Sequence, residues 1–378
     1  MSVTPRVLFV SKPVVPPWHD GSKNLVRDIA AHLVRARPTV LTTPGPAPLG
    51  PRVTAEAVYR SPGRFAPGVA ANARVLARLL TRDPHDLWHF FFAPNPASSF
   101  AARLARGCRR SLGWRGKVIQ TVASAPRDFG GVSRLLFGDV VVALSEWTRA
   151  KLVGGGADAS RLRVIGPCAA APEVPSTDRV RQQRNRHALG DARVVLYPGD
   201  YELSRGAATF TTSIATLARD VPDAVFVFAC RAKTPRAGEA RVELSATIEA
   251  AGLAQRVRHV GEVDDMAALL AASTVVAFPV DDLYGKVDLP LVLLEALALG
   301  VPLVLTRGGP LETITAARFV DQADAAGLAV ALAGLLARDE DARALAGRGK
   351  ELYAKRFTPP VVAAQYDDLY EELLSETP

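Results

Sequence analysis

The sequence predicts an α/β protein built from two doubly wound parallel-sheet domains. Three observations carry this prediction. The chain has 378 residues, which is long for one hydrophobic core and comfortable for two. Apolar strand segments alternate with helices along the chain. The alternation stops at a proline-rich stretch, residues 167–178, and then starts again. We therefore expect domains at 1–170 and 193–356, a linker at 171–192 and a closing helix within 357–378.

The first half begins with a strand–loop–helix–strand unit. An apolar strand at 6–10 is followed by a loop rich in proline that ends at Gly21. A helix at 22–35 has apolar residues at helical spacing, and a second strand covers 40–42. The later elements are strands at 87–92, 117–122, 139–143 and 162–165, with helices at 98–106 and 146–153.

The second half repeats this pattern after a polar, basic helix at 180–188. The predicted strands are 194–197, 224–229, 257–260, 275–279 and 303–306. The predicted helices are 207–218, 242–251, 266–272, 292–299 and the amphipathic segment 359–374. In parallel sheets the loops after the strands share one edge, so we expect a ligand to bind between two such edges.

Composition narrows the class of protein. Hydrophobic residues make up 48% and charged residues 22%, as in an ordinary globular enzyme. No apolar run reaches the roughly 20 residues that span a bilayer, and the first residues lack the order of a signal peptide. The three cysteines have no CxxC spacing, which predicts buried free thiols. We expect a cytoplasmic protein.

Charge is distributed unevenly. Residues 1–190 carry 28 Lys and Arg against 11 Asp and Glu, a net +17, whereas the remainder is −9. A basic half suits an anionic lipid surface at the inner face of the membrane, a phosphate-bearing acceptor or nucleic acid. A solvated, arginine-rich surface is the alternative. The sequence has no nucleic-acid-binding signature, so we exclude nucleic acid.

The segment from Lys286 to Pro302 carries the most specific motif, Leu-Glu295-Ala-Leu-Ala-Leu-Gly-Val-Pro. It resembles the retaining GT-B glycosyltransferases of family 4, the glycosyl transferases group 1. The resemblance implies two Rossmann-like domains that face a cleft, with a C-terminal helix that returns to the first domain. It also implies transfer of a sugar from a UDP-sugar or GDP-sugar to an acceptor hydroxyl, with retention and without a metal or other cofactor. The acceptor would be a sugar, a lipid-linked glycan or a small natural product.

In this family the acid at the place of Glu295 holds the donor ribose, and carboxylates bind paired hydroxyls well. Local capping or pairing is the alternative role for Glu295. The family's first Glu is replaced by Val287. We assign Lys286 and Asp288, which flank it, to the donor site together with Leu291.

A turn after the first strand of the second domain resembles the element that binds the donor diphosphate. Gly199, Arg205 and Gly206 match it, whereas Asp200 stands where the family has a cation. Arg205 is the expected catalytic cation because arginine binds phosphate in a bidentate manner. Arg231 and Lys233, after the next strand, are candidate replacements for the missing cation, Lys233 as a catalytic residue and Arg231 as a donor ligand. Both could instead lie in a solvated turn.

The loop before the first predicted helix resembles the family's N-terminal glycine-rich loop. The helix start would offer free N–H groups to a phosphate, which places Gly21, Ser22 and Lys23 in the donor site and Trp18 and His19 near the acceptor. The alternative is that Asp20 caps the helix.

The strand at 87–92 resembles an element with two histidines, of which only His89 is present, at a catalytic position. Phe91 occupies the second position and is assigned to the acceptor site with Asn95 and Ser124. His89 also fits a buried, hydrogen-bonded histidine. Three other functions stay open: a catalytically degenerate sugar-nucleotide-binding or partner protein, a sugar-nucleotide 2-epimerase, and a two-lobed binding protein.

Overall fold

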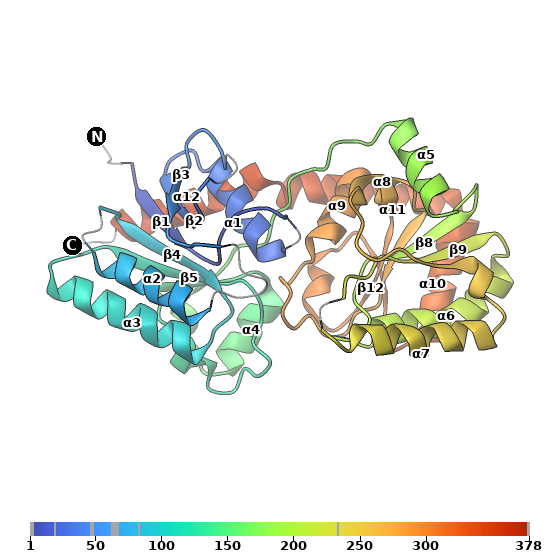
Figure 1. Ribbon diagram of the computed structural model, residues 1–378, viewed down its shortest axis with the longest axis horizontal. Coiled ribbons are helices and arrows are strands. Elements are labelled where there is room, and N and C mark those ends of the chain that lie inside the picture. The colour runs from blue at the N-terminus through green and yellow to red at the C-terminus, as the bar shows by residue number, and fades with distance from the viewer. Residues whose placement is uncertain are drawn as a thin grey trace. The chain divides into compact units, whose positions relative to one another are not determined.

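The computed structural model describes residues 4–18, 20–45, 49–61, 68–81, 84–232 and 234–375. The chain forms two compact units (Figure 1). Unit 1 comprises Met1–Ala170, Tyr284–Leu291 and Arg356–Pro378, and unit 2 comprises Ala171–Leu283 and Val292–Lys355. The short segment Tyr284–Leu291, which the sequence placed in the second domain, therefore belongs with the first unit.

Unit 1 is built on a parallel sheet in the order β3-β2-β1-β4-β5-β6-β7. The strands are β1 (Arg6–Val10), β2 (Arg37–Thr42), β3 (Thr54–Ala57), β4 (Leu87–Phe92), β5 (Lys117–Val122), β6 (Val140–Ala143) and β7 (Leu162–Val164). Its helices are α1 (Gly21–His32), α2 (Val69–Leu80), α3 (Pro96–Ser111), α4 (Glu146–Gly154) and α12 (Pro359–Ser375), with 3-10 turns η1 (Val132–Leu135) and η2 (Ala159–Arg161). The strand order reverses between β1 and β4, which is the ligand-binding position in doubly wound sheets.

Unit 2 repeats this architecture with the order β10-β9-β8-β11-β12-β13. Its strands are β8 (Arg193–Tyr197), β9 (Ala224–Phe228), β10 (Val257–His259), β11 (Val275–Phe278), β12 (Leu303–Thr306) and β13 (Arg318–Val320). Its helices are α5 (Thr177–Arg186), α6 (Gly206–Asp220), α7 (Ala237–Ala250), α8 (Met266–Ala271), α9 (Leu291–Leu299), α10 (Ala325–Ala337) and α11 (Asp339–Arg356), with η3 (Ala254–Arg256) and η4 (Pro310–Thr313). The strand order reverses between β8 and β11.

The C-terminal helix α12 packs against α1 of unit 1, as the predicted fold requires. The buried Asp367 carboxylate accepts hydrogen bonds from the Val34 and Arg35 N–H groups, at 2.8 and 3.1 Å. These N–H groups are bound by α12 instead of continuing α1, so α1 ends at His32, earlier than the predicted Arg35. Arg163 adds an ion pair to Glu372 of α12 at 2.9 Å.

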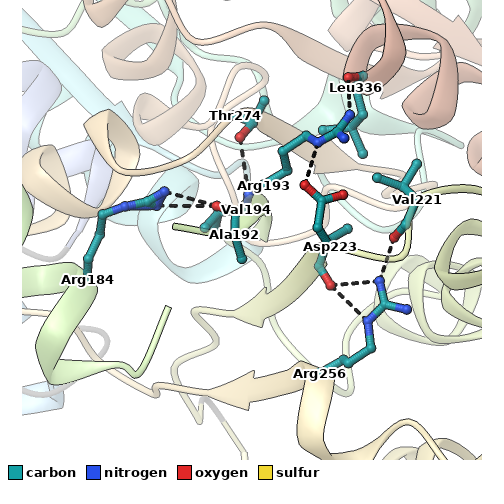
Figure 2. Close-up of polar contacts among 10 residues, drawn as sticks. Arg184, Ala192, Arg193, Val194, Val221, Asp223, Arg256, Thr274 and Leu336 are labelled. Atoms are coloured by element: carbon teal, nitrogen blue, oxygen red, sulfur yellow. Dashed lines mark hydrogen bonds and ion pairs between the residues drawn. The ribbon is translucent and has the colours of Figure 1, made fainter. Parts of the chain in front are cut away.

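Three arginines of unit 2, on α5, β8 and η3, have structural roles (Figure 2). Arg193 pairs with Asp223 at 2.8 Å and donates to the Leu336 carbonyl at 2.7 Å. Arg256 donates to the Val221 carbonyl at 2.6 Å, and Arg184 donates to the Ala192 carbonyl at 2.9 Å. These guanidinium groups bind main-chain carbonyls, so part of the arginine content stabilises the fold and is not available to a ligand.

Some elements have no counterpart in the prediction. The edge strand β3 is mostly exposed and polar, and it exists because it pairs with β2. Helix α10 packs against α6 and strands of the sheet, but it is apolar on every side, including the exposed Val330, so it lacks the one-sided pattern of a surface helix. No helix in the described parts of the chain is long and apolar enough to cross a membrane.

Candidate functional site

The loop after β8 forms a tight turn at the carboxyl edge of the unit 2 sheet. The Tyr197 hydroxyl donates to the Asp200 carbonyl at 3.0 Å, so the phenol ring lies beneath the turn. A Cβ atom on Gly199 would come within 2.3 Å of this ring, and one on Gly206 would come within 2.8 Å of a Val280 methyl group. Only glycine fits at these two positions, which explains the glycine pattern of the motif.

Asp200 does not face a ligand. Its side chain is fully buried and accepts a hydrogen bond from the Leu203 N–H at 3.0 Å. The assignment of Asp200 to the donor site is therefore wrong. The carboxylate holds its own turn together.

Arg205 stands at the N-terminus of α6, where the strand order of unit 2 reverses. Its Nε donates to the Asp281 carboxylate at 2.5 Å, and its backbone N–H donates to the same carboxylate at 3.0 Å. The Arg205 side chain is 65% exposed, whereas that of Asp281 is only 10% exposed. Asp281 thus fixes the base of an arginine whose outer end reaches solvent. Sequence reasoning missed Asp281, although it follows a predicted strand at the edge where ligands bind.

A cavity of about 630 Å³ opens beside this turn, at the carboxyl ends of β9 and β10. Its lining includes the predicted Arg231 together with Tyr201, Arg241, Gly261 and Glu262, which were not predicted. The Tyr201 hydroxyl lies 2.7 Å from His259 Nδ1, which orients the phenol ring. Lys233, the other predicted cation, lies outside the described residues.

In unit 1, the N-terminus of α1 is already capped. The Asp20 carboxylate accepts from the N–H groups of Ser22 and Lys23, at 3.0 and 3.3 Å, and from Lys12 Nζ at 2.6 Å. Burial opposes ionisation of Asp20, but Lys12 and these hydrogen bonds outweigh it and hold the pKa of the carboxyl below its usual value. The expectation that Ser22 and Lys23 offer free N–H groups to a phosphate is therefore wrong.

The other residues of this loop have defined surroundings. Burial lowers the pKa of the Lys23 amine, whose side chain is almost fully buried. The guanidinium of Arg27 lies 4.7 Å from the centre of the half-buried Trp18 ring. A Cβ atom on Gly21 would lie 3.3 Å from Val287, so this glycine permits close packing within unit 1. His19 lies outside the described residues.

His89 belongs to the core of unit 1. Its Nδ1 lies 2.8 Å from the Tyr370 hydroxyl and its Nε2 lies 2.7 Å from the Thr121 hydroxyl. The ring is fully buried, and burial holds the pKa of His89 well below its usual value. With both nitrogens bonded and no access to solvent, His89 cannot act on a substrate here. Its assignment as catalytic is therefore wrong.

Phe91 is also a core residue. It is 2% exposed and packs between Phe9 and Tyr366, with ring centres 5.6 and 6.2 Å away. Helices cover both faces of β4, so the side chains of alternate residues are all enclosed. The assignment of Phe91 to the acceptor site is wrong for this reason.

Two further acceptor candidates lie at the carboxyl edge of the unit 1 sheet. The Asn95 side chain caps α3 by accepting from the Ser98 N–H at 2.9 Å, and it donates to the Ala93 carbonyl at 3.0 Å. Its amide is thus used within the fold. Ser124 follows β5 and is half-buried.

Asp288 is held inside unit 1. The Ser145 hydroxyl donates to its carboxylate at 2.5 Å, and Ser145 itself caps α4 by accepting from the Thr148 N–H at 3.1 Å. Asp288 is 1% exposed, and burial raises its pKa. This contact contradicts a direct donor-binding role for Asp288. Lys286 is half-buried and Leu291 is buried, while Glu295 is half-buried on α9.

Known proteins agree with this architecture. A family model for glycosyl transferases group 1 matches residues 192–338. These residues form a glycosyl transferases group 1 domain. The same domain holds Gly199, Arg205, the cavity and Glu295. No three His, Cys, Asp or Glu side chains of the described residues are grouped as metal ligands would be.

The chain is 29% identical over 226 residues to D-inositol 3-phosphate glycosyltransferase of Corynebacterium urealyticum, an alignment that covers 57% of this chain. The chain spans about half the length of the curated relatives it matches (52% of this one). Sucrose-phosphate synthase of Thermosynechococcus elongatus is similar in structure, with a TM-score of 0.75, 20% identity and coverage of 99% of this chain and 100% of that one.

Anabaena HepE, in complex with UDP and glucose, gives a TM-score of 0.73 at 17% identity and covers 98% of this chain and 99% of its own. At these sequence identities the structural similarity shows a shared fold and nothing more. It confirms the predicted GT-B class, with two Rossmann-like parallel-sheet domains and a C-terminal helix.

Proposed function

We propose that this protein transfers a glycosyl unit from a nucleoside-diphosphate sugar to an acceptor hydroxyl. The observation that carries the proposal is the edge of unit 2 where the strand order reverses. There Arg205 begins α6 beside a glycine turn, and a cavity with two further arginines opens beside Tyr201 of this turn, at the carboxyl ends of β9 and β10. A diphosphate fits the arginine and the positive end of the helix, and a nucleoside fits the cavity.

The residues of this edge have separate roles. Arg205 and the start of α6 stabilise the charge on the departing diphosphate, with Arg231 and Lys233 as further cations. The Asp281 carboxylate neutralises part of the Arg205 charge but fixes its position, which preorganises the site. Glu295 accepts hydrogen bonds from the ribose hydroxyls. The acceptor hydroxyl attacks the face that the diphosphate leaves and gives its proton to the departing phosphate, so configuration is retained, and no metal takes part.

The donor and acceptor can be proposed by class. HepE is described in complex with UDP and glucose, which favours a UDP-sugar over a GDP-sugar here. The matched corynebacterial relative acts on an inositol phosphate, as its name states. The net +17 charge of residues 1–190 suits such a phosphate-bearing acceptor, whether a sugar, a lipid-linked glycan or a small natural product. We place the protein in the cytoplasm, with peripheral contact at the inner face of the membrane.

A second function is supported by particular positions. His89, Asp200 and Asp288 are buried and bonded within the fold, so three members of the predicted site do not reach a ligand. A catalytically degenerate protein that binds a sugar nucleotide would tolerate these changes, because binding needs only the diphosphate and ribose contacts.

One pair of experiments separates the two functions. A thermal-shift screen with UDP, GDP and their glucose forms identifies the nucleotide that stabilises the chain. Release of free nucleoside diphosphate is then measured with the matching donor and with inositol phosphate or a mixture of lipid-linked acceptors. Stabilisation with acceptor-dependent release supports transfer, and stabilisation without release supports the degenerate protein. No stabilisation by any nucleotide would contradict both.

A further inference from the structure

Large apolar side chains are exposed along the outward face of α3 in unit 1. Phe100 is 69% exposed and Leu104, one helical turn later, is 44% exposed. Leu112, directly after the helix, is 70% exposed. Isolated exposed leucines are ordinary. An aromatic side chain and two leucines on and directly after one helix form an apolar patch of the kind that binds a partner.

Arginines flank this apolar row. Arg110 lies on the exposed side of α3 and Arg115 follows the helix, whereas Arg103 donates to the Leu136 carbonyl at 3.0 Å. Arg110 keeps about half of its side chain exposed and lies 3.9 Å from Asp139. By contrast, Arg106 and Arg109 turn inward, with Arg106 donating to the Phe137 carbonyl at 2.9 Å. The helix therefore separates structural arginines from outward-facing ones.

Acidic residues are missing from this region of the sequence. None occurs between Asp86 and Asp128, which includes all of α3, and none occurs between Glu56 and Asp83, which includes all of α2. Helices α2 and α3 lie beside each other in unit 1 (Figure 1). The surface around Phe100 thus lies in a positive field without local compensation on its own helices.

The structure assigns this face a partner: we propose that the outward face of α3 and the residues after it (Phe100, Leu104, Arg110, Leu112 and Arg115) dock on an anionic lipid surface. Apolar side chains of this kind insert at the boundary between headgroups and acyl chains, while arginines bind the headgroup phosphates. A second copy of the chain fits less well, because pairing this face with itself would bring arginines against arginines. The inference rests on the peripheral membrane contact proposed above and names the face that makes it, but it does not depend on the glycosyl transfer.

Co-sedimentation of the full chain with vesicles tests this proposal. The vesicles contain phosphatidylcholine alone or with about 30% phosphatidylglycerol, at low and high salt. We expect binding only to the anionic vesicles, with loss at high salt because the attraction is screened. The double variant Phe100→Ser/Leu104→Ser should lower the partition coefficient by about tenfold or more, since it removes the inserting groups.

The variant Arg110→Ala/Arg115→Ala should lower binding by about tenfold, and its remaining binding should depend less on salt. The matched control Val330→Ser changes an apolar side chain that is 71% exposed on α10 of unit 2 and should bind as the wild type does. Unchanged melting temperatures show that each variant is folded. Equal binding of wild type and face variants, or no binding to anionic vesicles at low salt, would overturn the proposal. So would a wild-type dimer that the Phe100→Ser/Leu104→Ser variant dissociates, because the face would then join two copies.

Discussion

Burial of His89 predicts a specific dependence of stability on pH. The ring is fully buried between Tyr370 and Thr121, and within the described residues it contacts hydroxyl and aromatic groups. Its folded-state pKa lies well below 6.5 because burial penalises the charged ring. In the unfolded chain the same ring titrates near the ordinary value of about 6.5.

The linkage between proton binding and folding gives the sign and the size of this pH dependence. Because the folded pKa is depressed, the neutral ring favours folding above pH 6.5, and this stability is lost as the pH falls through 6.5 towards the folded pKa. If folded His89 stays neutral, the free energy of unfolding decreases by about 2 kcal/mol between pH 7.5 and pH 5.0. The variant His89→Gln cannot bind this proton. It should be less stable than the wild type at pH 7.5 by about 1–3 kcal/mol through imperfect hydrogen bonds, and it should lose about 2 kcal/mol less on acidification.

Tryptophan fluorescence can follow unit 1 by itself. All four tryptophans, Trp18, Trp88, Trp114 and Trp147, lie in the part of the sequence that belongs to unit 1. Urea unfolding at pH 7.5, 6.5, 5.75 and 5.0 then gives the free energy of unfolding of that unit for the wild type and for His89→Gln.

The control is a histidine substitution in the other unit. His259 lies in unit 2, so His259→Gln should leave the fluorescence-detected pH dependence unchanged. Parallel pH profiles for the wild type and His89→Gln would refute the reasoning. They would mean that His89 is protonated as easily in the folded chain as in the unfolded one, and that it is accessible to a substrate after all.

Three further substitutions test unit 2. Arg205→Ala should raise the Kd for UDP or GDP by about 10–150-fold in calorimetry, the scale of a hydrogen bond to a charged group, whereas Arg219→Ala, exposed at the other end of α6, should not. An unchanged Kd would remove Arg205 from the diphosphate site. Glu295→Ala should weaken nucleotide-sugar binding by about 1.5–3 kcal/mol, and equal binding would exclude its ribose role. Gly199→Ala should lower the free energy of unfolding of unit 2 by about 1–3 kcal/mol, since a methyl group would clash with the Tyr197 ring. Circular dichroism during urea unfolding measures this loss. In the same assay Gly238→Ala, where nothing lies within 4 Å of the added methyl group, should leave the free energy of unfolding unchanged or raise it.

Most strands and helices of both units could be predicted because their hydrophobic patterns are local in the sequence. The strand β8 and its glycine turn were recognisable from an apolar run followed by Pro198 and Gly199. The apolar helix α9 was recognised because Glu295 and Pro302 interrupt a run that would otherwise read as a single segment. The helices α2, α10 and α11 and the strands β3 and β13 were missed. Among them, α10 and β3 exist through their neighbours, α6 for one and β2 for the other.

The candidate site was predicted less well than the fold. The position of Arg205 at the start of α6 agrees with the motif, and Arg231 lines the cavity beside it. His89 and Phe91 were misassigned because one exposed edge was expected after β4, whereas both faces of this strand are covered. Asp281 was overlooked although it follows a predicted strand, and its ion pair with Arg205 shows that it belongs to the site.

By itself, the sequence determined the order of strands and helices, the two-domain α/β class and the family of the second domain. These features depend on hydrophobic periodicity and on a motif of contiguous residues, and both can be read from neighbouring positions in the sequence. Only the tertiary structure decided which polar side chains remain available to a ligand. Asp200 is bonded within its own turn, whereas Asp288 and His89 are held by partners far away in the sequence, Ser145 at 143 residues and Tyr370 at 281 residues. Such partners satisfy buried polar groups, and local sequence cannot show them because the requirement arises only when the core closes.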